Sequence, residues 1–139
     1  MKTPAGANVV SVVAPFENPA PPGMKQGAFD AVTFFYAYHD ITYLGVDRPK
    51  LLKAIYAALK PGGEFVMGDY SAKHGAGSSA VSTLHRSDEA LVTSEIDAAG
   101  FKLVAHGDFL RVSSDTRETH SHSSARPVDI YLLKFKKPG

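Results

Sequence analysis

The sequence predicts an α/β domain with a mostly parallel sheet, and three observations support this fold class. Residues 29–36 and 64–69 are short and strongly apolar, as strands of such sheets are. Between them, from Asp47 to Pro61, apolar residues recur at helical spacing. A strand, a helix and a second strand within about forty residues are typical of a right-handed βαβ unit, whose two strands lie parallel.

Composition and charge are those of one globular unit. The 139 residues have room for a single domain, so we expect residues 1–139 to form one. The chain is 44% hydrophobic, with a formal net charge of +1 and both signs scattered, which argues against disorder and against a nucleic-acid partner. It has no cysteine, which excludes disulfide bonds, cysteine zinc sites and thiol catalysis. No apolar run approaches the ~18 residues of a membrane span, so we expect a cytoplasmic protein without a membrane partner.

Residues 1–28 are expected to contribute one strand and a loop. The segment 9–13 is short and β-branched, and Pro15 closes it, which predicts a strand. Residues 18–23 combine prolines with a glycine, a composition that excludes both a helix and a central strand. We expect residues 29–139 to hold the βαβ units and a closing hairpin.

The first βαβ unit carries clear boundary signals. Residues 29–36 are nearly all apolar after Asp30, which predicts a central strand covered on both faces. Asp47 can cap the following helix, and Pro49 falls in the first turn, where a missing N–H costs little. Pro61-Gly62-Gly63 ends the helix. Its apolar face consists of Leu51, Leu52, Ile55, Tyr56 and Leu59.

The rest of the chain predicts a loop, a second helix and two more strands. Residues 71–83 are rich in glycine and serine, which indicates a surface loop with some local helix. Ser87-Asp88-Glu89 offers a capping hydroxyl and two acids to a helix that ends at Gly100. We predict that residues 101–105 and 128–135 are antiparallel strands, and that the polar run 113–126 between them builds no core.

Several short strings, in this order, resemble those of class I S-adenosylmethionine-dependent methyltransferases. They are Phe29-Asp30-Ala31-Val32, Leu59-Lys60-Pro61-Gly62-Gly63 and Ala98-Ala99-Gly100-Phe101. A tighter resemblance is to a group of bacterial predicted methyltransferases, through Tyr38-His39-Asp40 and Leu84-His85-Arg86 among others. Tyr70 departs from that group, in which histidine stands at this position.

The resemblance implies a Rossmann-like sheet of strand order 3-2-1-4-5-7-6, with helices on its faces and an antiparallel last strand. This chain would supply strands three to seven, residues 9–13 being strand three. The family holds its cofactor on a glycine-rich loop after strand one and on an acid after strand two. The sequence contains neither this loop nor this acid at the end of a strand. Its only Gly-x-Gly, at residues 75–77, is not preceded by a hydrophobic strand. We therefore expect an N-terminally incomplete domain with an incomplete cofactor site.

Candidate site residues follow the two parallel strands, because α/β sheets bind ligands at the carboxyl ends of their strands. His39, Asp40 and Asp69 stand there and are the predicted catalytic residues. His39 can act as a base oriented by either acid, or can simply cap the strand end. For the cofactor the resemblance implies Phe16, stacked on the adenine or packed on the sheet, and Tyr38.

His85 and Arg86 are the predicted substrate-binding residues. A guanidinium can bind an anionic substrate through two parallel hydrogen bonds. Alternatively, His85 and Arg86 form a solvated start of the second helix. His120-Ser121-His122 lies in the polar run without a carboxylate or cysteine at a recognised ligand spacing. We therefore predict a flexible tract there and no metal site.

The function that the resemblance implies is methyl transfer from S-adenosylmethionine to a small molecule or another acceptor that the sequence does not identify. One alternative is a non-catalytic remnant or partner-binding subunit, and another is a different α/β protein such as a nucleotide binder or a reductase fragment. Without strands one and two, residues 29–36 expose a long edge, which invites pairing with a second copy or a completing partner. Residues 9–13 either dock on this edge or stay loose.

Overall fold

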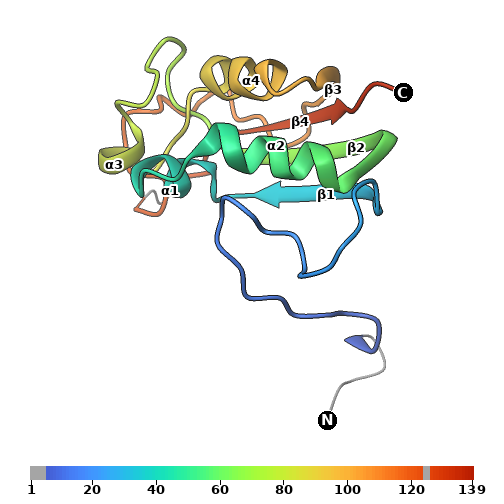
Figure 1. Cartoon of the computed structure of the whole chain (residues 1–139). Helices are drawn as coiled ribbons and strands as arrows, with labels where there is room; N and C mark the ends of the chain where they lie inside the picture. The colour runs from blue at the N-terminus through green and yellow to red at the C-terminus, as the bar shows by residue number, and fades with distance from the viewer. Residues whose placement is uncertain (1–5, 124–125) are drawn as a thin grey trace.

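The computed structural model describes residues 6–123 and 126–139. The elements, in chain order, are β1 (Phe29–Phe35), α1 (Tyr38–Tyr43), α2 (Arg48–Ala58), β2 (Leu59–Tyr70), α3 (Val81–Leu84), α4 (Glu89–Ala98), β3 (Lys102–Gly107) and β4 (Ile130–Lys136). The strands form a sheet in the order β1-β2-β4-β3 (Figure 1). β1 and β2 pair in parallel, and β4 is antiparallel to both β2 and β3. This arrangement confirms the predicted βαβ unit and the closing antiparallel pair.

Helix α2 begins where the sequence predicts but ends at Ala58, so Leu59, which was expected on its apolar face, belongs to β2. The Asp47 carboxylate accepts the Lys50 N–H at 3.0 Å, and a proline stands in the first turn. After the helix, β2 starts at Leu59 and takes the Pro-Gly-Gly turn into its first half. Gly62 adopts a left-handed φ of +76°, and a Cβ on Gly63 would lie 2.9 Å from a backbone oxygen. Each glycine thus serves a different need of the turn.

One face of the sheet carries the core. Alternate side chains of β2 and β4 point to this face, and α2 and α4 cover it (Figure 1). The fully buried core members from the two strands are Leu59, Phe65, Met67, Tyr131, Leu133 and Phe135. Each such side chain stabilises the fold by about 1.5–3 kcal/mol relative to an exposed one.

Strand β1 is an edge strand of this sheet, and the prediction of a strand covered on both faces is wrong for this chain. Phe29 is 40% exposed and Phe35 is 43% exposed. The apolar character of residues 29–36 therefore exceeds what the described residues bury. In the strand order that the resemblance implies, this edge is where strand one would pair.

The segment 9–13 forms no strand, which corrects the prediction made for it. Val10 is 80% exposed and Val13 is fully exposed, and the segment lies apart from β1 without pairing with it (Figure 1). A β-branched run gains little from an extended conformation unless another strand pairs with it. The sheet therefore contains four of the five strands expected, corresponding to the order 4-5-7-6.

Two local details differ from the sequence prediction. Helix α1 was not predicted, and no side chain caps it, since its N-cap residue is Ala37. The cap of α4 is Asp88, whose carboxylate accepts the Ala90 N–H at 3.0 Å, and the hydroxyl of Ser87 is used elsewhere. Of the helices that the structure describes, none combines the length and the apolar character that crossing a membrane requires.

Candidate functional site

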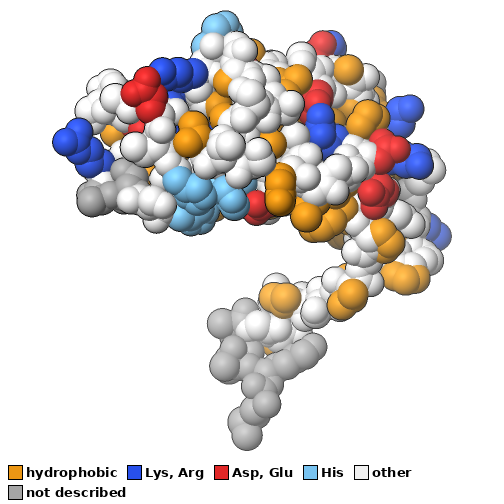
Figure 2. All heavy atoms as spheres, turned by 90° about the vertical axis from the view of Figure 1, so that its left-hand side faces the viewer, with side chains coloured by type: hydrophobic (Ala, Val, Ile, Leu, Met, Phe, Trp, Pro, Cys, Tyr) orange, Lys and Arg blue, Asp and Glu red, His pale blue; other side chains and the backbone are white. Residues whose placement is uncertain are grey.

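The predicted site residues meet at the carboxyl ends of β1 and β2. His39 comes from α1, Asp69 from β2, and His85 directly follows α3, so three elements converge at this end of the sheet (Figure 1). Figure 2 looks onto this end and shows histidine side chains gathered in one patch. Of the seven predicted site residues, the structure brings together His39, Asp40, Asp69 and His85.

The buried pair of His39 and Asp69 forms the base of the site. The His39 Nδ1 lies 2.7 Å from the Asp69 Oδ1, and the two side chains are 2% and 0% exposed. Asp69 also accepts the backbone N–H of His39 and the hydroxyl of Ser87, both at 2.8 Å. Because a carboxylate only accepts, Nδ1 carries the proton of the neutral imidazole, and the lone pair of that form lies on Nε2. Asp69 thus fixes both the orientation and the tautomer of the imidazole.

Asp40 supplies a second carboxylate on the open side of the ring. Its Oδ1 lies 3.4 Å from the His39 Nε2 and 3.8 Å from the His85 Nδ1. Burial alone would lower the pKa of His39, but the hydrogen bond and charge of Asp69 and the charge of Asp40 outweigh it and raise the pKa above its ordinary value. The two acids thus favour a protonated His39.

Two further histidines join the site from the polar run 113–126. The His120 ring stacks on His85 with centroids 4.4 Å apart, and the His122 ring centroid lies 5.9 Å from that of His85. Side-chain nitrogens of His39, His85 and His122 all lie within 4.8 Å of one another. The prediction of a flexible tract is therefore wrong for these residues, and we call His39, His85, His120 and His122 the histidine cluster.

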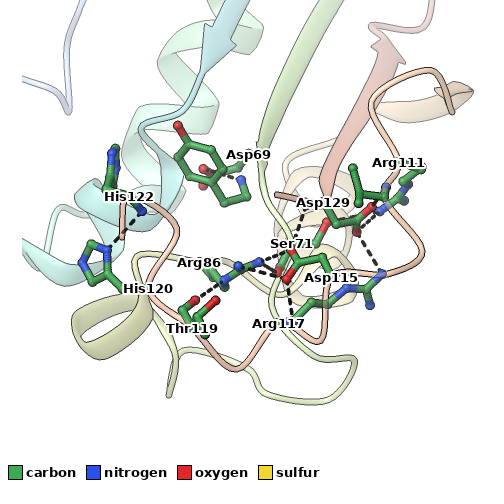
Figure 3. A network of polar contacts seen from close by, with 12 residues as sticks. Asp69, Ser71, Arg86, Arg111, Asp115, Arg117, Thr119, His120, His122 and Asp129 are labelled. Carbon is green, nitrogen blue, oxygen red and sulfur yellow. Dashed lines mark hydrogen bonds and ion pairs between the residues drawn. The ribbon is translucent and has the colours of Figure 1, made fainter. Parts of the chain in front are cut away.

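Arg86 explains why this loop is ordered. The side chain is fully buried and donates to the Thr119 carbonyl at 2.8 Å, the Ser71 carbonyl at 2.9 Å and the Asp115 carboxylate at 2.8 Å (Figure 3). In addition, the Ser121 N–H donates to the Leu84 carbonyl at 2.9 Å. These bonds tie the loop to the end of β2 and to the residue before His85.

The same contacts correct the predicted role of Arg86. Each of its three guanidinium nitrogens donates to a protein group, so the side chain is not placed to fork an anionic substrate. Asp115 also accepts the backbone N–H of Asp129 at 2.8 Å and of Arg117 at 3.0 Å. The polar run thus adds a hydrogen-bonded polar network beneath the site instead of remaining in solvent (Figure 3).

Two tyrosines and a strained backbone border the cluster. Tyr70 stacks on Tyr36 with centroids 5.2 Å apart, and its ring lies 5.8 Å from that of His39. Tyr36 has a φ of 55° and His85 a φ of 49°, left-handed conformations that are uncommon for residues with a side chain. Such residues cost about 1–3 kcal/mol and cluster at functional sites.

The two residues predicted for cofactor binding lie apart from the cluster's open side. Tyr38 is 1% exposed, and its hydroxyl donates to Glu95, so its side chain belongs to the core and is not free for a ligand. Phe16 is 47% exposed and lies in a turn. The next residue, Glu17, accepts the backbone N–H of Asp47, the N-cap of α2, at 3.4 Å. The stacking of Phe16 on an adenine stays a prediction.

The Gly-x-Gly string of the described residues, Gly75-Ala76-Gly77, lies in open space. A Cβ added at Gly75 or Gly77 would meet no atom within 4 Å, so no backbone approaches closely there. Both glycines lie in the loop between β2 and α3. What the described residues do provide is the exposed ring of Phe16 and the histidine cluster.

Comparisons with known proteins agree with this fold. Residues 2–67 match a family model described as a methyltransferase domain, whereas no curated protein matches the chain. The solved structure of the [4+2]-cyclase SpnF is similar with a TM-score of 0.63 and 18% identity, over 92% of this chain and 55% of that one.

Two further solved structures are similar. A methyltransferase of Haloferax volcanii, in complex with the methyltransferase activator Trm112, has a TM-score of 0.58 and 15% identity over 92% of this chain and 61% of its own. A S-adenosylmethionine-dependent methyltransferase of Aquifex aeolicus has a TM-score of 0.61 and 11% identity over 94% of this chain and 56% of its own. At these identities the similarity establishes the fold, and the chain spans less than two thirds of each of these proteins.

The domain match covers β1, α1, α2 and most of β2, which together position His39 and Asp40. The sheet order corresponds to strands four, five, seven and six of the order that the sequence resemblance implies. Together, the domain match over residues 2–67 and the shared fold support the resemblance of this chain to class I S-adenosylmethionine-dependent methyltransferases.

Proposed function

We propose that this chain takes part in methyl transfer from S-adenosylmethionine and that the methyl acceptor lies against the histidine cluster. The observation that carries the proposal is the buried pair of His39 and Asp69 at the carboxyl ends of two parallel strands, with Nε2 on the open side. Ligands of open α/β sheets bind in the crevice at these ends.

His39 is the group proposed to take the acceptor's proton. Asp69 holds Nδ1 protonated, which leaves Nε2 to accept, and the charge of Asp40 at 3.4 Å stabilises the resulting imidazolium. A positioned base of this kind contributes about 10²–10⁴-fold to a rate. Tyr36 and Tyr70 would form an aromatic wall beside the acceptor.

Fewer residues of this chain are proposed to contact the cofactor than to contact the methyl acceptor. Phe16 is the proposed contact to the adenine, because its ring is exposed at the start of α2. The glycine-rich cradle would come from a segment that pairs with the free edge of β1, whether in the same polypeptide or in a completing partner. The Haloferax volcanii methyltransferase in complex with its activator is one instance of a partner in this fold.

A second candidate is a partner-binding subunit without catalysis of its own. The open space around Gly75 and Gly77 favours it, because no part of the described chain replaces the missing cradle. Under this proposal the chain would bind no S-adenosylmethionine by itself.

Calorimetric titration of the chain with S-adenosylmethionine separates the two candidates. We expect a heat signal from the wild-type chain, a weaker affinity in Phe16→Ala, and no change in the matched control Phe109→Ala, whose ring is 79% exposed. His39→Gln should bind the cofactor like the wild type, since His39 serves the acceptor. Silence from the wild-type chain would show that this chain does not hold the cofactor alone and would favour the second candidate, a partner-binding subunit.

A further inference from the structure

The nitrogens of the histidine cluster converge from parts of the chain that are distant in sequence. His39 lies on α1, His85 follows α3, and His122 lies in the loop before β4. One side-chain nitrogen from each lies within 4.8 Å of the other two. From this geometry we propose that His39, His85 and His122 form a binding site for a divalent transition-metal ion, with Zn²⁺ as the best fit.

The spacing of these nitrogens is close to that of a bound site. Zinc holds imidazole nitrogens at about 2.0–2.1 Å, which puts two tetrahedral ligands about 3.4 Å apart. The three nitrogens therefore need to close by little more than an ångström, and His85 and His122 are not buried, so their rings have room to turn. The buried His39 can remain in place.

His39 is already oriented as metal-ligating histidines are. Such histidines donate their second ring N–H to a carboxylate or carbonyl, which fixes the tautomer and raises the basicity of the ligating nitrogen. The Asp69 Oδ1 takes this position at 2.7 Å from Nδ1 and leaves Nε2 for the ion. A buried acid that also accepts from Ser87 and from the His39 backbone is a rigid support for a ligand.

The other two ligands are held together by the backbone. The Ser121 N–H donates to the Leu84 carbonyl at 2.9 Å, and these residues are the immediate neighbours of His122 and His85. Ser121 is only 7% exposed, so this junction is part of the packed structure. The His122 N–H donates to the His120 Nδ1 at 3.2 Å, which engages that ring and leaves it as a wall of the site.

The donor set decides the kind of ion. Imidazole nitrogens suit zinc, copper, nickel and iron, whereas magnesium and calcium prefer sites built from oxygen. Three histidines leave one tetrahedral position open, as in catalytic zinc sites. The Asp40 Oδ1, 3.4 Å from the His39 Nε2, supplies a carboxylate next to that position.

The metal site stands on the histidine geometry and does not require the cofactor. Its use in catalysis does rest on the proposed function. With an ion on Nε2, His39 is a ligand and no longer the proton acceptor, and an acceptor oxygen or nitrogen in the open position would have its pKa lowered by the metal.

Calorimetric titration of the chelator-treated, untagged full chain with ZnCl₂, without S-adenosylmethionine, tests the site. We expect one equivalent to bind, a loss of affinity of about tenfold or more in His85→Gln and His122→Gln, and about 10–100-fold in Asp69→Asn, which acts through His39. His106→Gln is the matched control, because His106 is 51% exposed and pairs with Glu89 outside the cluster. Titration with Co²⁺ should produce visible absorption bands of a tetrahedral site.

Two outcomes would overturn the inference. One is a wild-type chain that takes up no zinc, and the other is zinc binding that His85→Gln and His122→Gln leave unchanged. Neither variant replaces a buried side chain, so both should fold, which circular dichroism would verify. The cofactor titration described above omits zinc, so failure of the metal site and failure of the proposed function give different results.

Discussion

Replacement of Arg86 by methionine tests how the histidine loop is held. The change keeps much of the side-chain volume but removes every donor to Thr119, Ser71 and Asp115. Removing one partner from a buried ion pair costs about 3–5 kcal/mol, because the other charge stays buried and unpaired. Asp115 retains two backbone N–H donors, so we expect the lower end, about 3 kcal/mol.

Urea unfolding, followed by circular dichroism in the presence of a chelator, measures this loss. For a small domain, 3 kcal/mol shifts the midpoint by about 1–3 M. The matched control is Lys102→Met, which breaks an ion pair with Asp97 whose side chains are 65% and 57% exposed. Exposed pairs contribute about 0–1 kcal/mol. If Arg86→Met costs no more than this control, the guanidinium does not anchor the loop.

Two more stability predictions follow from contacts in the same structure. Burial alone would raise the pKa of Asp115, but the hydrogen bond from Arg86 and those from two backbone N–H groups lower it. The contribution of Asp115 to the free energy of unfolding is therefore fully present above its unfolded pKa of about 3.9. It is lost as the pH falls through the lower pKa of the folded state. The urea midpoint should therefore fall on acidification, and less so in Asp115→Asn; equal slopes would contradict this. A Cβ at Gly63 would lie 2.9 Å from the Lys60 carbonyl oxygen, so Gly63→Ala should lower the free energy of unfolding by about 1–3 kcal/mol, whereas Gly139→Ala, with no atom within 4 Å, should leave it unchanged.

The βαβ unit could be predicted because its signals are local. Asp47 and Pro49 define the start of α2, and the Pro-Gly-Gly turn defines the passage into β2, whatever the rest of the chain does. The segment 9–13 was predicted as a strand from the same kind of local signal, yet strand formation requires a partner that propensity cannot supply. Helix α1 has no side-chain cap, so the sequence carries no start signal from which this helix could be predicted.

The site could be predicted only in part. His39, Asp40 and Asp69 follow from the rule that parallel strands present ligand-binding residues at their carboxyl ends. Arg86 and His122 do not, since their roles depend on a contact between the residues after α3 and a loop more than thirty positions later. A polar loop looks solvated until its buried partner is known, and neither the full burial of Arg86 nor its ion pair with Asp115 can be predicted from spacing alone.

The chemistry of a protein with this fold is decided at the crevice and not by the sheet order. The fold is shared with a protein named for a [4+2]-cyclisation as well as with methyltransferases, so the sheet order limits where chemistry takes place without fixing what it is. In this crevice a buried Asp69–His39 pair faces two more imidazoles, His85 after α3 and His122 from the ordered loop. A proton acceptor needs one such imidazole, whereas the approach of three nitrogens is the arrangement that a metal ion requires. The outcome of the zinc titration therefore discriminates between two chemistries of the same residue, His39.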